Sequence, residues 1–297
     1  FQRKAKEDSG ALDMSLLVEE KKLLVASEEK GRKEDRVKCL DLHPTEPLAL
    51  AATWGGKVIL WNLDASTIVR TFSVSAKSVR ACKFIPGSSR FACGSDDKHL
   101  RVYDSLTAEL VHDVEDAHDD YVRSIDVHPS KPLMLSSGDD MAIKLWQGAQ
   151  LKAAYAGHAH YVMMVRFNHS DDGATFASGS LDKTVKVWAL DSPQGEPLCT
   201  LVHGDKGVNC LSYSPGGTYL ATGADDYTVK LWDYGAKTCI ATLGGHLNNV
   251  SAVLFHPHLP LLVSASEDGT VKLYHCVTGG FVVVVDEITT LNSGLER

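Results

Sequence analysis

Three side chains in the middle of the sequence have the residue types of a serine-hydrolase triad. They are His158, Ser178 and Asp182, a candidate base, nucleophile and orienting acid. A similar set recurs in imperfect form elsewhere along the chain, whereas a catalytic set would occur once. We therefore expect these residues to form a structural hydrogen-bond network, and the sequence predicts no catalytic residue and no enzymatic activity.

Two histidine pairs have the chemistry of metal ligands, His158 with His160 and His256 with His258. No carboxylate or cysteine completes either set, and no Cys-x-x-Cys motif occurs among the 7 cysteines. The sequence also has no glycine-rich loop of the phosphate-binding type. We therefore expect no metal and no cofactor, and we expect the cysteines to be reduced thiols.

Charged residues at two sets of equivalent positions indicate binding rather than catalysis. The first set follows the valine that opens each expected inner strand: Lys38, Arg80, Arg123, Met163, Asn209 and Ser251. The second set directly precedes a turn: Trp54, Asp96, Asp139, Leu181, Asp225 and Glu267. Arg36 adds to the basic positions of the first set, and Asp119 and Asp120 add to the acidic positions of the second. Both sets are expected on one face, near a central channel.

A basic arc beside an acidic arc suits a ligand with a negative end and positive side chains close to it. A peptide C-terminus preceded by lysines has this chemistry. Its carboxylate would accept charge-assisted hydrogen bonds from arginine and lysine, and its ammonium groups would lie among carboxylates. Trp54, Tyr121 and Tyr161 are expected to pack against the aliphatic stems of the lysines. Exposed ion pairs contribute only about 0–1 kcal/mol each, so we expect micromolar, salt-sensitive binding.

The overall composition narrows the class of partner. The chain has 297 residues, with 38 acidic and 30 basic side chains and a net charge of −8. A surface this acidic is a poor match for nucleic acid, which requires basic contacts to phosphate. No apolar run approaches the roughly 18 residues of a membrane-spanning helix.

The elements that must position these residues are repeated units. A hydrophobic segment ending in an aromatic residue recurs every 42 to 44 residues, at Trp61, Tyr103, Trp146, Trp188, Trp232 and Tyr274. Six residues before each aromatic residue stand Gly55, Asp97, Asp140, Asp182, Asp226 and Asp268. Alternating apolar residues, β-branched residues and Gly/Asp turns predict about four short strands per unit.

A unit of four strands in about 42 residues resembles the blade of a WD40 β-propeller. This resemblance implies an all-β fold with six repeats over residues 36–297, preceded by an N-terminal extension, 1–35. Within the extension, 22–27 is a candidate outer strand that closes the ring. At the other end, 281–285 is expected to be the outer strand of the sixth blade. A seven-bladed ring with the seventh blade truncated or missing is the favoured architecture, and closure with six blades is the alternative.

Several segments resemble the beginning of coatomer beta-prime subunits. They are Asp35–Lys38 with Leu42–Pro47, Ser78–Arg80, His158–Met163, Gly207–Cys210, Asn249–Ser251 and Leu291–Arg297. Coatomer alpha subunits share the first and third of these segments, and the last three favour beta-prime. Coatomer coats vesicles that return from the Golgi to the endoplasmic reticulum, and the first propeller of the family binds dilysine signals at cargo C-termini.

The resemblance implies two groups of peptide-binding residues. The carboxylate-binding group is Arg36, Lys38 and Arg80. The lysine-binding group is Asp120, Asp139 and Asp225. The supporting residues are Trp54, Asp96, Tyr121 and Tyr161. The resemblance further implies a cytoplasmic protein that is recruited to Golgi membranes and coated vesicles, contacts membranes only through the coat, and has other coatomer subunits, the alpha subunit among them, as partners.

Two departures from the family pattern affect these expectations. Trp54 stands where the family usually has tyrosine. His203-Gly204 inverts the usual Gly-His order, which predicts that the hydrogen-bond network of the fifth repeat lacks its histidine. The alternative function is that of a different interaction propeller, such as a ubiquitin-ligase or signalling scaffold, which uses the same face for another ligand.

Overall fold

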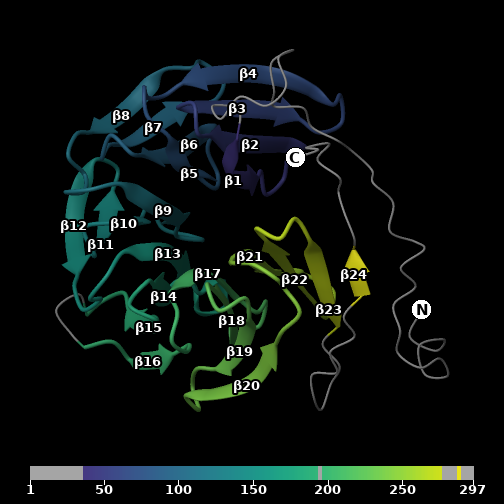
Figure 1. Cartoon of the computed structure of the whole chain (residues 1–297). Helices are drawn as coiled ribbons and strands as arrows, with labels where there is room; N and C mark the ends of the chain where they lie inside the picture. The colour runs from purple at the N-terminus through teal and green to yellow at the C-terminus, as the bar shows by residue number, and fades with distance from the viewer. Residues whose placement is uncertain (1–35, 193–195, 276–285, 289–297) are drawn as a thin grey trace.

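The computed structural model of the protein describes residues 36–192, 196–275 and 286–288. These residues form six four-stranded sheets arranged like blades around a central axis (Figure 1). A single turn of 3-10 helix, His169–Asp171, lies in one of the loops. Within these three ranges, the structure has no helix with the length and apolar character needed to cross a bilayer.

Each of the first three sheets consists of four consecutive antiparallel strands. Sheet one contains β1 (Val37–Leu42), β2 (Leu48–Thr53), β3 (Lys57–Asn62) and β4 (Thr67–Ser73). Sheet two contains β5 (Val79–Phe84), β6 (Arg90–Ser95), β7 (Leu100–Asp104) and β8 (Leu110–Val114). Sheet three contains β9 (Val122–Val127), β10 (Met134–Gly138), β11 (Ile143–Gln147) and β12 (Gln150–Tyr155).

The last three sheets repeat this pattern. Sheet four contains β13 (Val162–Phe167), β14 (Thr175–Ser180), β15 (Thr184–Ala189) and β16 (Cys199–Val202). Sheet five contains β17 (Val208–Tyr213), β18 (Tyr219–Ala224), β19 (Val229–Asp233) and β20 (Thr238–Leu243). Sheet six contains β21 (Val250–Phe255), β22 (Leu261–Ser266), β23 (Val271–His275) and β24 (Asp286–Ile288). The predicted all-β propeller of six repeats is therefore confirmed.

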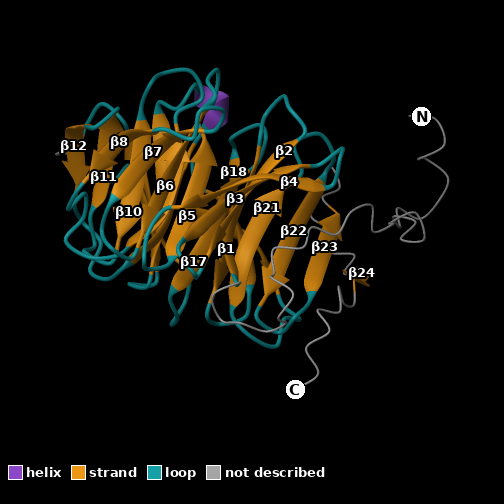
Figure 2. Ribbon diagram, turned by 90° about the horizontal axis from the view of Figure 1, so that it is seen from above, coloured by secondary structure: helices purple, strands orange, loops and turns teal. Residues whose placement is uncertain are grey.

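The strands run between two faces made of loops (Figure 2). The first strand of each sheet is innermost, so β1, β5, β9, β13, β17 and β21 surround the axis. We call the face where these six strands begin the rim face. The loop that contains His169–Asp171 follows the end of β13, so this turn of helix marks the opposite face (Figure 2).

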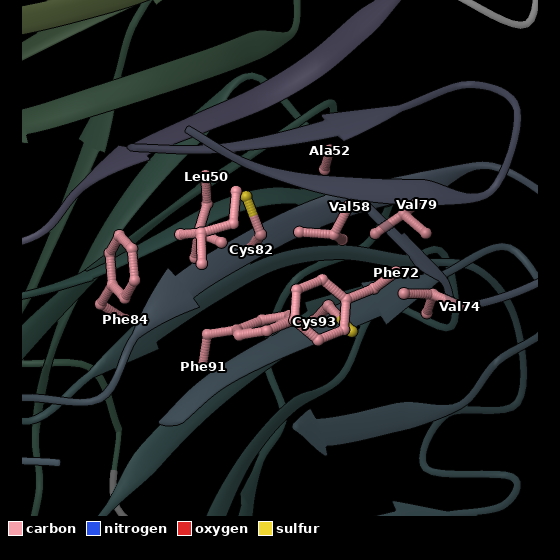
Figure 3. Packing of buried hydrophobic residues seen from close by; sticks show 11 residues of the cluster. Leu50, Ala52, Val58, Phe72, Val74, Val79, Cys82, Phe84, Phe91 and Cys93 are labelled. Carbon is pink, nitrogen blue, oxygen red and sulfur yellow. The ribbon is translucent and has the colours of Figure 1, made fainter. Parts of the chain in front are cut away.

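The core lies between neighbouring sheets. Between sheets one and two, apolar side chains from both sheets interdigitate (Figure 3). The rings of Phe72 and Phe91 meet edge to face, with centroids 4.9 Å apart. Leu50 and Phe91 are completely buried in this cluster, and full burial of such a side chain contributes roughly 1.5–3 kcal/mol. Similar clusters fill the next four interfaces.

In sheets three to six, a hydrogen-bond network around a histidine ties the loop before the inner strand to its sheet. In sheet three, His118 contacts Asp140 through Nδ1, at 2.8 Å, and Ser136 through Nε2, at 2.6 Å. Trp146 donates its indole N–H to the same serine, at 2.8 Å. Sheet four has His158, Asp182, Ser178 and Trp188 in these places, and sheet six has His246, Asp268, Ser264 and Tyr274.

The triad-like residues are therefore structural, as the sequence predicts. Ser178 is completely buried and already accepts the indole N–H of Trp188, so it is not exposed to a substrate. Although burial opposes ionisation, hydrogen bonds from His158 and Thr184 hold the pKa of Asp182 below its usual range. The ionised carboxylate thus stabilises the turn and the histidine together.

The prediction for the fifth repeat is wrong, because sheet five keeps its histidine. His203 is completely buried, and its Nδ1 lies 2.9 Å from the hydroxyl of Thr222, to which Trp232 also donates. Its Nε2 lies 3.2 Å from Thr228 Oγ1 and 3.5 Å from Asp226. Compared with sheets three, four and six, the two ring nitrogens have exchanged places. The ring can therefore complete the network from the inverted His-Gly order.

The first and last sheets are packed differently from the others. Each inner strand packs closely against the next one from β1 through to β21, but β21 and β1 do not make a comparable contact within the described ranges. Leu40 and Leu42 of β1 are 63% and 66% exposed, and Leu254 of β21 is 63% exposed. The described residues form six sheets and no seventh. The predicted strands 22–27 and 281–285 lie outside the described residues, and β24 supplies the fourth strand of sheet six.

Candidate functional site

A β-bulge at the second residue of every inner strand builds the rim face. The ladder between β1 and β2 pairs Val37 with Thr53 and then Cys39 with Ala52, so Lys38 is left without a partner. The same shift occurs in the other five sheets. The bulged residues are Lys38, Arg80, Arg123, Met163, Asn209 and Ser251. A bulge changes the direction of a side chain, so the first predicted set is re-aimed together at the rim.

The second predicted set is brought to the same rim by a repeated backbone hydrogen bond. The residue after each second strand donates its N–H to the carbonyl of a residue that precedes the inner strand. The donors are Trp54, Asp96, Asp139, Leu181, Asp225 and Glu267. The acceptors are Arg36, Ser78, Tyr121, Tyr161, Gly207 and Asn249. The predicted placement of both sets on one face is therefore confirmed.

In sheets two and three, the two sets pair with each other through ion pairs. Arg80 binds Asp96 through Nε and Nη2, and Arg123 binds Asp139 in the same way at 2.5 Å. Both carboxylates are buried. Two parallel hydrogen bonds fix the plane of a guanidinium group, so each carboxylate orients its arginine. For both arginines, the structure gives Nη1 no hydrogen bond within the described part of the chain.

The acidic side chains of sheets five and six have neutral partners. Asn209 donates to Asp225 Oδ1 at 2.7 Å, and Asn249 donates to Glu267 at 3.3 Å. Glu267 is exposed and Asp225 is half-buried. Because no cation neutralises them in these contacts, negative charge on the rim is concentrated at sheets five and six, opposite the arginines.

Aromatic rings separate the cations along the rim. Lys38 Nζ lies 4.6 Å from the ring centroid of Trp54, and the Arg80 guanidinium lies 5.5 Å from both Trp54 and Tyr121. Arg123 lies 6.0 Å from Tyr121 and 5.9 Å from Tyr161. A cation over an aromatic face is stabilised by about 0.5–1 kcal/mol at an exposed site. The three aromatic residues therefore hold the chain's own cations, a role that the sequence analysis missed, and their contact with ligand lysines stays a prediction.

The rim is electrostatically positive around sheet one. Partial burial and the charges of Arg80 and Arg36 lower the pKa of Lys38. Burial disfavours the charged form of Arg123 as well, but the hydrogen bond and charge of Asp139 outweigh this effect and raise its pKa. An incoming anion would relieve the repulsion among these cations, so the region suits a carboxylate.

The rim opens into a cavity of about 330 Å³ that follows the axis. Its wall includes Lys38, Lys83, Arg80, Arg123 and Arg166, and Asp225 and Glu267 at the other side. The cavity is thus lined by Lys38 and Arg80 of the predicted carboxylate-binding group and by Asp225 of the predicted lysine-binding group. It also includes Glu267 and Arg123, which the predicted site omits although their positions in the repeat are equivalent to those of its members.

Two further predicted residues, Arg36 and Asp120, are not part of the cavity wall. Arg36 is exposed, and its carbonyl accepts the N–H of Trp54. Asp120 is half-buried and accepts the N–H of Tyr121 through Oδ1 at 2.8 Å. Since Asp139 donates its own N–H to the Tyr121 carbonyl, Asp120 and Asp139 flank the same tyrosine.

The histidine pairs have other partners. His158 belongs to the network of sheet four, and His160 accepts the N–H of Tyr161 through Nδ1. His256 accepts the N–H groups of His258 and Leu259, at 3.1 and 2.9 Å. Among the residues that the structure describes, no group of three His, Cys, Asp or Glu side chains has an arrangement suited to a metal ion.

Six four-stranded blades, three complete Asp-His-Ser-aromatic networks and a charged rim around an axial cavity define a β-propeller of the WD type. The chain belongs to the WD40 repeat family: the family model described as "WD domain, G-beta repeat" matches residues 26–62, 66–104, 109–147, 149–189, 195–233 and 237–275. These matches bear out the six repeats that the sequence predicts.

Among curated proteins the chain is similar to coatomer beta-prime subunits, as the sequence resemblance indicates. It is 47% identical over 235 residues to coatomer subunit beta'-1 of Arabidopsis thaliana, covering 77% of this chain and 25% of that protein. It is 45% identical over 270 residues to coatomer subunit beta' of Rattus norvegicus, covering 89% and 28%. It is 44% identical over 248 residues to a probable coatomer subunit beta' of Schizosaccharomyces pombe, covering 82% and 31%. The chain thus spans about a quarter to a third of the length of these relatives.

Proposed function

We propose that this propeller is the cargo-binding module of a COPI vesicle coat and that its rim face binds C-terminal dilysine signals. The observation that carries the proposal is the rim itself, where bulges and turns assemble a cationic sector beside a carboxylate sector around one cavity. The similarity to coatomer beta-prime subunits supports the assignment to a coat. The module acts by binding and not by catalysis.

The peptide carboxylate binds in the cationic sector. Arg36 and Lys38 are exposed there, and Arg80 is held in place by Asp96, with Nη1 as the remaining donor. Because the carboxylate of Asp96 and the rings of Trp54 and Tyr121 fix the guanidinium, little side-chain entropy is lost on binding. A hydrogen bond to a charged group contributes roughly 1.5–3 kcal/mol.

The peptide lysines bind among the carboxylates. Asp139 already forms an ion pair with Arg123, so its carboxylate attracts a second cation more weakly. The side chain of Asp225 accepts from an amide and that of Asp120 from a backbone N–H, so both retain more attraction for a cation. Among the three predicted lysine-binding residues, we therefore assign the largest contribution to Asp225.

In this proposal the protein acts in the cytoplasm, on membranes of the Golgi and on coated vesicles. Its partners are the cytosolic C-terminal tails of membrane cargo and the other coatomer subunits, with the alpha subunit among them. It contacts the membrane only through the coat, and it does not bind nucleic acid. The net charge of −8 agrees with a preference for cationic tails.

Titration with a peptide ending in Lys-Lys-x-x tests the proposal. The free-acid peptide is expected to bind with micromolar affinity, and its C-terminally amidated form at least about tenfold more weakly, because one or more charge-assisted hydrogen bonds are lost. Equal affinity for the two peptides would contradict the proposal that Arg36, Lys38 and Arg80 bind the peptide carboxylate. It would favour the second candidate, a WD40 scaffold with a different ligand.

Single substitutions locate the lysine site. Asp225→Asn is expected to weaken the free-acid peptide several-fold, since it removes a carboxylate but keeps the side-chain shape. Asp191→Asn is the matched control, because Asp191 is exposed and follows β15 at the face opposite the rim. If both variants bind the peptide as the unsubstituted protein does, the lysines do not bind at Asp225.

A further inference from the structure

Arg166 places a guanidinium group in the wall of the axial cavity, below the rim. It is the fifth residue of the inner strand β13, three residues beyond the bulged Met163, which corresponds to about 10 Å along a strand. Its recorded hydrogen bonds all come from Nη1: to Val165 O at 2.9 Å, Ile125 O at 3.4 Å and Ser124 Oγ at 3.5 Å. All three acceptors are neutral.

The repeat provides an internal comparison for Arg166. The fifth residue of β5 is Lys83, which forms an ion pair of 2.5 Å with Asp41, the fifth residue of the preceding inner strand. Arg166 has the corresponding carboxylate, Asp126, on its own preceding strand. Asp41 and Asp126 both accept the N–H of the residue after the cation, at 2.8 Å.

The two pairs nevertheless differ. The described ranges contain no ion pair between Arg166 and Asp126, nor between Arg166 and any other carboxylate. Instead, the guanidinium reaches past Asp126 toward Ser124 at the third position of β9. Its Nε and Nη2 donors have no hydrogen bond to described residues. A half-buried arginine without a carboxylate partner is costly unless an anion compensates it.

The surroundings of Arg166 are positive. Cys39 lies in the same cavity wall, and, besides the hydrogen bond with Cys82, the charges of both Lys83 and Arg166 lower the pKa of its thiol. Lys83 and Arg166 therefore act on one region of the cavity. Ser124, whose oxygen already accepts from Arg166 and from the Val165 N–H, keeps its hydroxyl proton to donate to a ligand.

We propose that Arg166 and Ser124 form an anion-binding site in the axial cavity, one layer below the rim, that takes a single phosphate or carboxylate group. Arg166 supplies the charge and two parallel N–H donors, from Nε and Nη2, and Ser124 supplies a hydroxyl donor. A cavity of about 330 Å³ has room for such a group together with water. The group comes either from a free phosphate or from the C-terminus of a peptide that enters the cavity.

Titration of the whole chain with inorganic phosphate in chloride buffer, followed by NMR of the arginine Nε–H signals, tests the proposal. A saturable shift of the Arg166 signal is expected, and Arg166→Gln should weaken phosphate binding at least tenfold. Arg166→Lys, which keeps the charge but loses the fork, should retain part of the affinity. Arg90→Gln is the control, because Arg90 is exposed and begins β6 at the opposite face.

A second arm identifies the source of the anion and separates this site from the rim. If Arg166→Gln leaves the free-acid dilysine peptide within twofold of its affinity while phosphate binding is lost, the ligand is a free phosphate. If the free-acid peptide alone loses at least tenfold and the amidated peptide does not, the ligand is the peptide carboxylate. Arg166→Gln with unchanged affinity for both phosphate and peptide would overturn the proposal, whatever the outcome at the rim.

Discussion

At the scale of single residues, two arginines of the rim each contact a carboxylate and aromatic rings at the same time. Arg80 and Arg123 each donate from two of their three guanidinium nitrogens to a carboxylate of the same sheet. Each guanidinium also lies within 6.0 Å of two aromatic ring centroids. The third nitrogen stays directed away from the pair. Asp139, which the sequence assigned to ligand lysines, thus also orients Arg123, and its removal would loosen Arg123 as well as remove a charge.

His203, the histidine of sheet five, leads to a prediction about the stability of the protein at acidic pH. Burial lowers the pKa of His203 to about 4, compared with about 6.5 in an unfolded chain. Between these values the unfolded chain binds the additional proton, so the free energy of unfolding falls as the pH decreases from 6.5 toward 4. The whole shift corresponds to roughly 3 kcal/mol.

Urea unfolding at pH 7 and pH 5 of the unsubstituted protein and of His203→Gln measures this contribution. The variant is expected to be less stable at pH 7, because Thr222 loses a hydrogen-bond partner, and to lose less stability than the unsubstituted protein on going to pH 5. Identical losses in the two proteins would show that folding does not lower the pKa of His203.

At the scale of elements, the rim depends on two local devices, the bulge in each inner strand and the turn after each second strand. The turn residue before each third strand adopts a positive φ, whether it is a glycine or not: φ is 78° at Gly56, 76° at Lys98 and 68° at Tyr227. Left-handed backbone costs a non-glycine residue roughly 1–2 kcal/mol. A non-glycine residue nevertheless occupies this position in four of the six turns. The shape of the turn is therefore set by the sheet and not by the conformational preference of the residue.

Two of these turn glycines differ in the space around them, which gives a paired prediction. Gly56 and Gly269 have nearly equal φ angles of 78° and 81°, but a Cβ on Gly56 would lie 1.9 Å from the Ser75 carbonyl oxygen, while nothing lies within 4 Å of one on Gly269. Gly269→Ala is expected to cost about 1 kcal/mol. Gly56→Ala is expected to cost about 2–4 kcal/mol, because the backbone must also move. Thermal or urea unfolding compares the two, and a cost at Gly269 as large as that at Gly56 would contradict the steric explanation.

At the scale of the whole molecule, packing between blades is unequal around the ring. The inner strands β5, β9, β13 and β17 each pack against inner strands on both sides (Figure 1). Within the described residues, β5 is the one inner strand that packs closely against β1, and β17 the one that packs closely against β21. The exposed leucines of β1 follow from this arrangement. Full burial of a leucine contributes roughly 1.5–3 kcal/mol, and these partly exposed leucines gain only a part of it.

Hydrogen exchange should follow this inequality. Amides of β9 and β13 are expected to exchange slowest, close to the rate of global unfolding, and those of β1 and β21 faster, because opening an end blade exposes less apolar surface. Mass spectrometry of peptides from the four strands measures the order. Equal protection of β1 and β9 would indicate that the end blades are covered as well as the central ones.

Much of the fold follows from local sequence pattern. The period of 42 to 44 residues, the alternating strands and the aspartate before five of the six aromatic residues specify six blades, because each blade is built from contiguous residues and its turns have local chemistry. For the same reason, the positions of the rim charges within a blade could be predicted. Lys38, Arg80, Asp139 and Asp225 lie on the face that symmetry assigns to them.

Other features were decided only by the tertiary structure. The ring of His203 reverses its two nitrogens to complete a network that the inverted dipeptide seemed to break, and Lys83 binds Asp41 where Arg166 passes Asp126. The sequence by itself determined which residue types stand at each repeated position, since those positions are set by local spacing. Which cation meets which carboxylate was decided in three dimensions, because it depends on bulge geometry, side-chain length and the approach of neighbouring blades, and none of these is periodic in the chain.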